Sequence, residues 1–533
     1  MTNYEIKQIR HLADIIWAEV NKKKWPFEIP LKRIFGSSLP VHINDKNELN
    51  VILSRVEEYV ESICSNLSPS LLPLFIQMYQ LFYNGSWGRE PAWLGTVIKR
   101  LISNVYKNQF QSAQQFSNSR LDIIQSIYAL TLYESLLHYE LVGQFTDIKL
   151  IINREWLIPN HAETEYYYRE LAYMYSDRGR SHRTLKQSID MWVKNPTKLL
   201  DAINNILAGE LPSDQYLFRD NFFKLLPAKR SFWEQLRSYV QIGVAVVYQL
   251  ASNQVPFDYI VFLQGSRELN QRFGFNITSN VYWKKKWYFD IKGKVSKFDI
   301  PSLIVFRPAI NVIIDKNETI NVTSLSIVAD AINYFIESSI FDIYSGHDTP
   351  FKAFYQVVIS TPFEKEVQQL FREYGYITGY IPEPRIESSP ECIWELKENG
   401  SELSVKLVHN EGSAFPGEID ILAYHPVKKE FIVAECKTFH IPYSYEAMGS
   451  FVKRFQSRSK GSYQWKIKNK VSWLRKAIIM DEDLTIPIES LLDPNITLKS
   501  MFIVNRKIVN MNQFLQTPVY DIQRLKKILN GTL

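Results

Sequence analysis

Apolar residues recur at helical spacing through roughly the first half of the chain. Between about residues 4 and 250, runs that alternate apolar and polar side chains are few. The helical spacing is seen in one set at Ile9, Leu12, Ile15, Ile16 and Val20, and in another at Ile52, Val56, Val60 and Ile63. The pattern predicts a helical domain over residues 1–250.

Strand-like runs begin after about residue 255. They lie at 259–263, 303–306 and 309–314, and they predict a small intermediate α/β section over residues 251–354. Within it the sequence W-K-K-K-W at 283–287 combines basic and aromatic residues. A DNA contact and an exposed hairpin are both open interpretations of that cluster.

Residues 355–533 mix the two periodicities. An amphipathic helix is predicted from Thr361, with Gly375 as its end, and a short closing helix at 519–529. Strands are predicted at 375–377, 392–397, 403–408, 419–424, 431–437 and 501–505, which gives a sheet of four to six members. The predicted fold class is therefore a mainly helical N-terminal region followed by a C-terminal α/β domain, a mixed sheet flanked by helices.

Two of these strands carry charged residues that the apolar pattern does not explain. The segments G-E-I-D-I-L-A-Y (417–424) and F-I-V-A-E-C-K (431–437) are separated by a turn that contains Pro426, and they predict a hairpin. Glu435 and Lys437 share one face of the second strand, and Asp420 lies on the first. Buried carboxylates need compensation, and a hard cation such as Mg²⁺ or Mn²⁺ suits oxygen ligands.

The pattern Ile419-Asp420 followed by Glu435-Cys436-Lys437 resembles the PD-(D/E)XK nuclease superfamily, which includes restriction endonucleases and Holliday-junction resolvases. The motif G-E-I-D followed by V-x-E-x-K also resembles the signature of a small bacterial nuclease-like family, which has G-E-I-D followed by V-E-V-K. The resemblance covers roughly residues 355–533. It implies a restriction-endonuclease-like domain that hydrolyses phosphodiester bonds, in which Asp420 and Glu435 hold Mg²⁺ (or Mn²⁺) and Lys437 assists the attacking water.

The resemblance also implies a further metal ligand on the first core helix, which falls at Glu364. A structural explanation of the same residue stays open, because Thr361, Pro362 and Glu364 have the spacing of a capping box. Glu366 is the second candidate for this place. Glu418 lies on the same strand face as Asp420 and could add a ligand or mark a solvated strand end.

A basic run follows the hairpin. Residues 447–480 contain nine lysines and arginines and no acid, interleaved with Phe451, Phe455, Tyr463, Trp465 and Trp473. Cations that neutralise phosphates beside rings that stack on bases are typical of a nucleic-acid track, although a solvated basic helix is the alternative. The candidate contacts are Lys453, Arg454, Arg458, Lys460, Lys466, Lys468, Lys470 and Arg475.

Composition agrees with a multidomain protein of 533 residues, of which 46% are hydrophobic, with a net charge of +6. Three widely spaced cysteines suggest neither a disulfide framework nor a zinc site, and no apolar run is long enough for a membrane span. We expect a cytoplasmic protein without membrane association. The sequence contains no G-x-x-x-x-G-K-[ST] motif, so we do not expect it to use ATP by itself.

We therefore expect the protein to be a metal-dependent endonuclease, with DNA as the expected substrate and RNA as an alternative. A second alternative is a catalytically inactive nuclease-like protein that binds nucleic acid or serves as a scaffold. The N-terminal region is expected to bind a protein partner or sense a target, and a homodimer is expected because one metal centre cuts one strand at a time. Analogy suggests bacterial antiviral defence, restriction or mobile elements.

Overall fold

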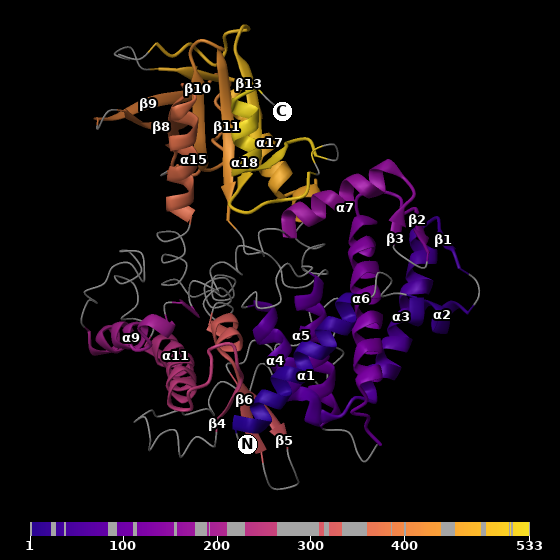
Figure 1. Ribbon diagram of the computed structural model, residues 1–533. Helices are drawn as coiled ribbons and strands as arrows, with labels where there is room; N and C mark the ends of the chain where they lie inside the picture. The colour runs from indigo at the N-terminus through magenta and orange to yellow at the C-terminus, as the bar shows by residue number, and fades with distance from the viewer. Residues whose placement is uncertain are drawn as a thin grey trace. The chain divides into compact units, whose positions relative to one another are not determined.

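The first part of the chain is built mainly from helices, and the C-terminal third contains a large sheet flanked by helices (Figure 1). The chain divides into two units. The first comprises Met1–Arg169, Arg178–Gly346 and Tyr443–Glu446, and the second comprises Glu170–Asp177, His347–Pro442 and Ala447–Leu533. The structure, a computed structural model, describes residues 3–22, 28–36, 39–83, 93–109, 115–153, 157–175, 189–190, 192–209, 230–263, 309–313, 319–332, 360–384, 386–398, 401–438, 453–480, 487–510, 512 and 515–531.

Helices form most of the first unit, as the spacing of apolar residues predicts. Helix α6 is buried along almost its whole length and packs against α3 and α5, so it forms the centre of this core. The helices are α1 (Asn3–Lys22), α2 (Glu28–Phe35), α3 (Lys46–Ser65), the 3-10 helix η1 (Pro69–Leu71), α4 (Leu72–Tyr83), α5 (Trp93–Asn108), α6 (Arg120–Val142), α7 (Ala162–Tyr175, which ends in the second unit), α9 (Lys198–Ala208) and α11 (Arg230–Ser252).

Two small sheets belong to the same unit. The sheet β1-β2-β3 joins Val41–Ile43, Leu150–Ile152 and Leu157–Pro159, and it was not predicted because strands of three residues show no alternation. The sheet β4-β6-β5 joins Val261–Leu263, Thr319–Thr323 and Ile310–Ile313. Its strands β4 and β5 fall within the runs at 259–263 and 309–314, whereas the run at 303–306 lies outside the described residues.

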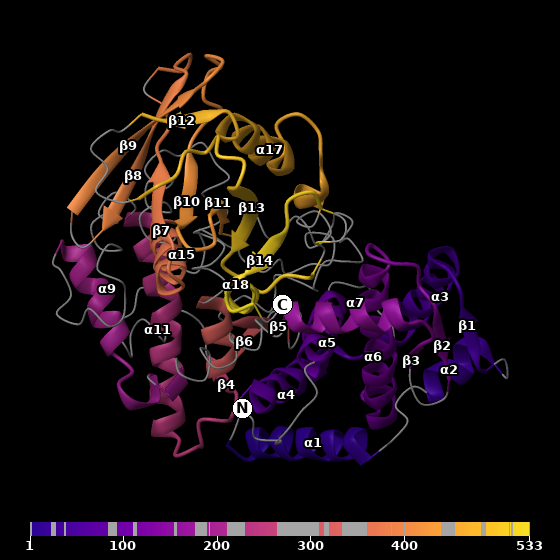
Figure 2. The same ribbon diagram turned by 90° about the horizontal axis from the view of Figure 1, so that it is seen from above.

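The second unit contains an eight-stranded mixed sheet, two strands more than the largest number predicted. The order is β12-β9-β8-β7-β10-β11-β13-β14; β11, β13 and β14 are parallel to their neighbours in that group, and the other pairs are antiparallel (Figure 2). The strands are β7 (Ile377–Ile381), β8 (Glu391–Glu398), β9 (Ser401–His409), β10 (Ile419–His425), β11 (Glu430–Lys437), β12 (Ala477–Ile479), β13 (Thr497–Val504) and β14 (Val519–Asp521).

Helices cover both faces of the central strands. Helices α15 (Thr361–Glu373) and α18 (Ile522–Leu529) share a core with the side chains of Ile421, Ala434 and Ile503. Helix α17 (Tyr463–Leu474) packs against β11 and β13, where Tyr463 lies beside Phe502. Because Phe502 and Ile503 are consecutive on one strand, they point to opposite faces, which places α17 on the face opposite α15 and α18.

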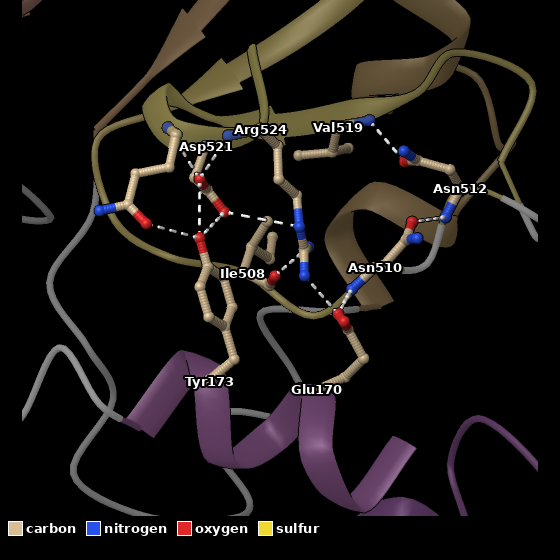
Figure 3. A network of polar contacts seen from close by, with 9 residues as sticks. Glu170, Tyr173, Ile508, Asn510, Asn512, Val519, Asp521 and Arg524 are labelled. Carbon is tan, nitrogen blue, oxygen red and sulfur yellow. Dashed lines mark hydrogen bonds and ion pairs between the residues drawn. The ribbon is translucent and has the colours of Figure 1, made fainter. Parts of the chain in front are cut away.

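The C-terminal end of α7 belongs to this second unit, where it joins the corner between β14 and α18 (Figure 3). The guanidinium of Arg524 donates to the carboxylate of Glu170 and to the carbonyl oxygen of Ile508. The Tyr173 hydroxyl lies 3.1 and 3.2 Å from the two carboxylate oxygens of Asp521, which also caps α18 through the amides of Gln523 and Arg524. Residues far apart in the sequence thus form one ion-paired network at the edge of the sheet.

Candidate active site

The predicted hairpin is confirmed, and it sets the position of the candidate site. Strands β10 and β11 pair antiparallel from His425 opposite Glu430 to Ile421 opposite Ala434, and Asp420 and Glu435 lie directly beyond this last pair. On its other side, β10 changes register against β7 between Ile419 and Leu422. A bulge of this kind twists a strand locally and redirects its side chains, and it includes Asp420.

The three charged residues of the motif meet at this end of the hairpin. The Lys437 ammonium lies 3.0 Å from Glu435 Oε2 and 3.3 Å from Asp420 Oδ2, so it bridges the two carboxylates. Asp420 Oδ2 also accepts a hydrogen bond of 2.7 Å from the backbone amide of Cys436. That amide fixes the aspartate against β11, because a backbone donor in a paired strand cannot turn away.

Helix α17 brings a fourth charged group, Lys470, which sequence reasoning assigned to nucleic-acid contact. The Lys470 ammonium lies 2.6 Å from Glu435 Oε1, and both side chains are only 8% exposed. The assignment to the basic track is therefore wrong for this residue, which faces the sheet together with Ile467 and Leu474. Spacing of three and four positions from those apolar residues is the signal that could have separated it from its exposed neighbours.

The charges at this site shift one another's pKa values. Burial, and then the Glu435 carboxylate, raises the pKa of Asp420 to about 6. Burial would also raise the pKa of Glu435, but Lys437 and Lys470 together outweigh it and the pKa is lowered. Burial would lower the pKa of Lys437, but the two carboxylates outweigh it and the pKa is raised. Glu435 and Lys437 are therefore both charged at neutral pH.

Glu364 lies near this group from the first turn of α15. Burial raises its pKa to about 7, and the Asp420 carboxylate adds to the rise while Lys437 opposes it. The capping explanation is not supported, because the helix begins at Thr361 with Ser360 as its N-cap and no side-chain capping bond is formed. Glu366 is exposed. Of the two candidates, Glu364 is therefore the one that lies close enough to Asp420 and Glu435 for their charges to raise its pKa.

The available donors fit a small hard cation. Among the described residues no group of three or more histidine, cysteine, aspartate or glutamate side chains is arranged to hold a metal ion. Mg²⁺ does not need such a cage, because one or two carboxylates, together with substrate phosphates and several retained waters, are its usual protein environment. Asp420 and Glu435 provide two carboxylates, and Glu364 and Glu418 lie near enough for Glu418 to raise the pKa of Glu364 as well.

The basic run includes the exposed face of α17 and the residues just before and after this helix. Seven of its eight candidate contacts are exposed, Lys470 being the exception: Lys453, Arg454, Arg458, Lys460, Lys466, Lys468 and Arg475. The aromatic part of the prediction is largely wrong. Phe455 and Trp473 are buried and serve the core, whereas Trp465 is 36% exposed. Phe451 and the cluster at 283–287 lie outside the described residues.

Comparison of the chain with protein-family models gave no match, and comparisons with curated proteins and with solved structures gave none either. Across the described segments, no helix has both the length and the apolar character that crossing a bilayer requires.

Proposed function

We propose that the second unit is a PD-(D/E)XK-type nuclease domain that hydrolyses phosphodiester bonds with Mg²⁺ or Mn²⁺, and that its substrate is DNA. The observation that carries the proposal is the bridging position of Lys437, 3.0 Å from Glu435 and 3.3 Å from Asp420 at the bulged end of the hairpin. Two acids and one lysine converge there from a strand pair whose intervening residues are largely apolar.

Each residue has a role that follows from its position. Asp420 and Glu435 would hold the cation, which when bound polarises a phosphoryl oxygen and acidifies water. Lys437 is the most exposed of the three, with 28% of its side chain accessible, so its ammonium can orient the attacking water or face a phosphate oxygen. Glu364, with a pKa of about 7, can hold or release a proton at its carboxylate near neutral pH.

The exposed cations along α17 supply the affinity for a polyanion. Lys466 and Lys468 lie on the solvent side of the same helix whose inner face carries Lys470 to the site. Each phosphate that a lysine neutralises releases condensed counterions, so binding should weaken steeply as salt rises. Replacing both lysines with alanine should reduce the slope of log K against log salt by about 2. An unchanged slope would contradict a role of these two residues in binding.

The experiment that tests catalysis incubates the full chain with supercoiled plasmid, single-stranded DNA and RNA in Mg²⁺ or Mn²⁺, with EDTA as the blank. Asp420→Ala and Lys437→Ala should each abolish cleavage, because each removes one member of the bridged group. The matched control is Lys499→Ala, which removes a lysine paired with Glu430 near the opposite end of β11. Cleavage that survives both site substitutions would refute the proposed site.

A non-catalytic nucleic-acid-binding protein is the second candidate. The observation that favours it is that two lysines, Lys437 and Lys470, already offset the charges of both carboxylates. Binding to all three substrates without metal-dependent cleavage would establish this alternative.

If cleavage occurs, the ratio of nicked to linear plasmid tests the proposed homodimer, since one centre per chain cuts one strand at a time. Cleavage of RNA alone would replace DNA as the substrate.

A further inference from the structure

Lys470 differs from Lys437 in how firmly the fold holds it. Its side chain is 8% exposed and extends from the inner face of α17, between Ile467 and Leu474 in the helical pattern. A buried ammonium needs a partner of opposite charge, and in the described structure that partner is Glu435 Oε1 at 2.6 Å. Lys470 therefore stays at the site whether or not substrate is present.

The donors on the two carboxylates are of two kinds. Glu435 Oε1 receives Lys470, and Asp420 Oδ2 receives the amide of Cys436, and both donors are fixed by the fold. Lys437 contacts Glu435 Oε2 and Asp420 Oδ2 from a side chain that is partly exposed and can rotate. Glu435 Oε2 is therefore free to meet a cation once Lys437 moves, while Oε1 remains bound to Lys470.

The charges of this group cancel. Asp420 and Glu435 contribute two negative charges, and Lys437 and Lys470 contribute two positive charges, so the sum is zero. A pair of carboxylates alone would attract a divalent cation strongly in a poorly solvated place. With both ammonium groups present, that attraction is weakened at short range.

We propose that Lys470 is a positioning residue that holds Glu435 in place. Its second effect is that the ammonium, buried beside Glu435, keeps the cation affinity of the free protein low. The negative charge that Lys470 cancels is then restored by a phosphodiester of the nucleic acid. Cation and nucleic acid should accordingly bind more tightly together than separately, each raising the affinity of the other by the same factor. The inference rests on the proposed function of the site.

The test measures Mn²⁺ binding to the full chain by titration calorimetry, with and without a phosphorothioate DNA duplex that resists cleavage. We expect wild-type protein to bind Mn²⁺ weakly alone and on the order of tenfold more tightly with the duplex. Lys470→Met keeps the length and apolar character of the side chain but removes the charge. It should bind Mn²⁺ on the order of tenfold more tightly without DNA, and the duplex should then add little.

Two further variants separate this effect from a structural one. Lys470→Arg retains the charge and should keep the weak binding of the wild type, and Lys499→Met removes a lysine from the pair with Glu430 and should change nothing. An unchanged or weaker Mn²⁺ affinity in folded Lys470→Met would overturn the inference. If Lys470→Met does not fold, equal wild-type Mn²⁺ affinity with and without duplex would overturn it instead. Absence of both Mn²⁺ binding and cleavage in the wild type would refute the proposed function itself.

Discussion

Replacing Glu364 by glutamine should stabilise the metal-free protein at alkaline pH. Glu364 lies where burial and the carboxylates of Asp420, Glu418 and Glu435 all disfavour its charge, while Lys437 only partly opposes them. Its pKa is about 7 in the folded chain against 4.5 in the ordinary case. Glutamine has nearly the same shape and no charge, so the variant removes the repulsion and leaves the packing of α15 intact.

The sign and size follow from the two pKa values. Because the folded-state pKa is the higher one, the folded chain holds a proton that the unfolded chain has lost between pH 4.5 and about 7. The free energy of unfolding therefore falls across that interval, and the whole cost is present above it. At 1.36 kcal/mol for each pKa unit, the difference between 4.5 and about 7 corresponds to at most ~3.4 kcal/mol. Glu364 is only partly buried, so solvent screening reduces the expected gain to ~1–2 kcal/mol at pH 8.

Thermal denaturation of wild type and Glu364→Gln in EDTA, at pH 4 and at pH 8, measures this difference. We expect a higher melting temperature for the variant at pH 8 and equal melting temperatures at pH 4. Glu366→Gln is the matched control, because Glu366 is exposed on the same turn and should follow the wild type at both pH values. Equal behaviour of Glu364→Gln and wild type at pH 8 would show that Glu364 does not share the field of Asp420.

Two further substitutions test how the sheet of the second unit is built. In Gly379→Ala the new Cβ would lie 2.1 Å from the carbonyl oxygen of Glu395, so β7 and β8 must separate, and we expect a loss of about 1–3 kcal/mol in thermal denaturation. In Arg524→Met, Glu170 loses its cation, and we expect a loss of about 2–3 kcal/mol by urea denaturation. Lys526→Met on the exposed side of α18 is the control for the second change, and equal stability of both α18 variants would contradict the network.

The hairpin and its motif could be predicted because they depend on local spacing. Alternation along a strand places Glu435 and Lys437 on one side, and the short turn after His425 forces the strand of Asp420 to lie beside them. The helix from Thr361 and the strand around Met501 were likewise set by their own apolar patterns. These elements bury enough apolar surface over enough residues for the pattern to be visible in the sequence.

The rest of the site depends on pairing between distant segments. The bulge at Asp420 arises from the pairing of β10 with β7, whose residues precede Asp420 by about forty positions. The residues next to Asp420 in the sequence therefore give no signal that predicts the bulge. Local charge assigns Lys470 to the basic run, whereas its spacing from Ile467 and Leu474 places it on the buried face of α17. Strands β12 and β14 have three residues each and are defined by their partners.

The position of the site within the sheet explains why so many charges are needed to hold two acids. Strand β11 is buried over nearly its whole length and lies between helices on both faces, so an ionised Glu435 there would cost several kcal/mol without partners. Lys437 from the same strand and Lys470 from α17 provide those partners, but Lys437 offsets only part of the repulsion at Glu364, whose pKa stays raised. A purely structural ion pair would need no third carboxylate at this place. If the proposed cation binds beside Glu364, it would offset the repulsion that raises the pKa of this carboxyl, and the pH dependence of stability would then change on metal binding.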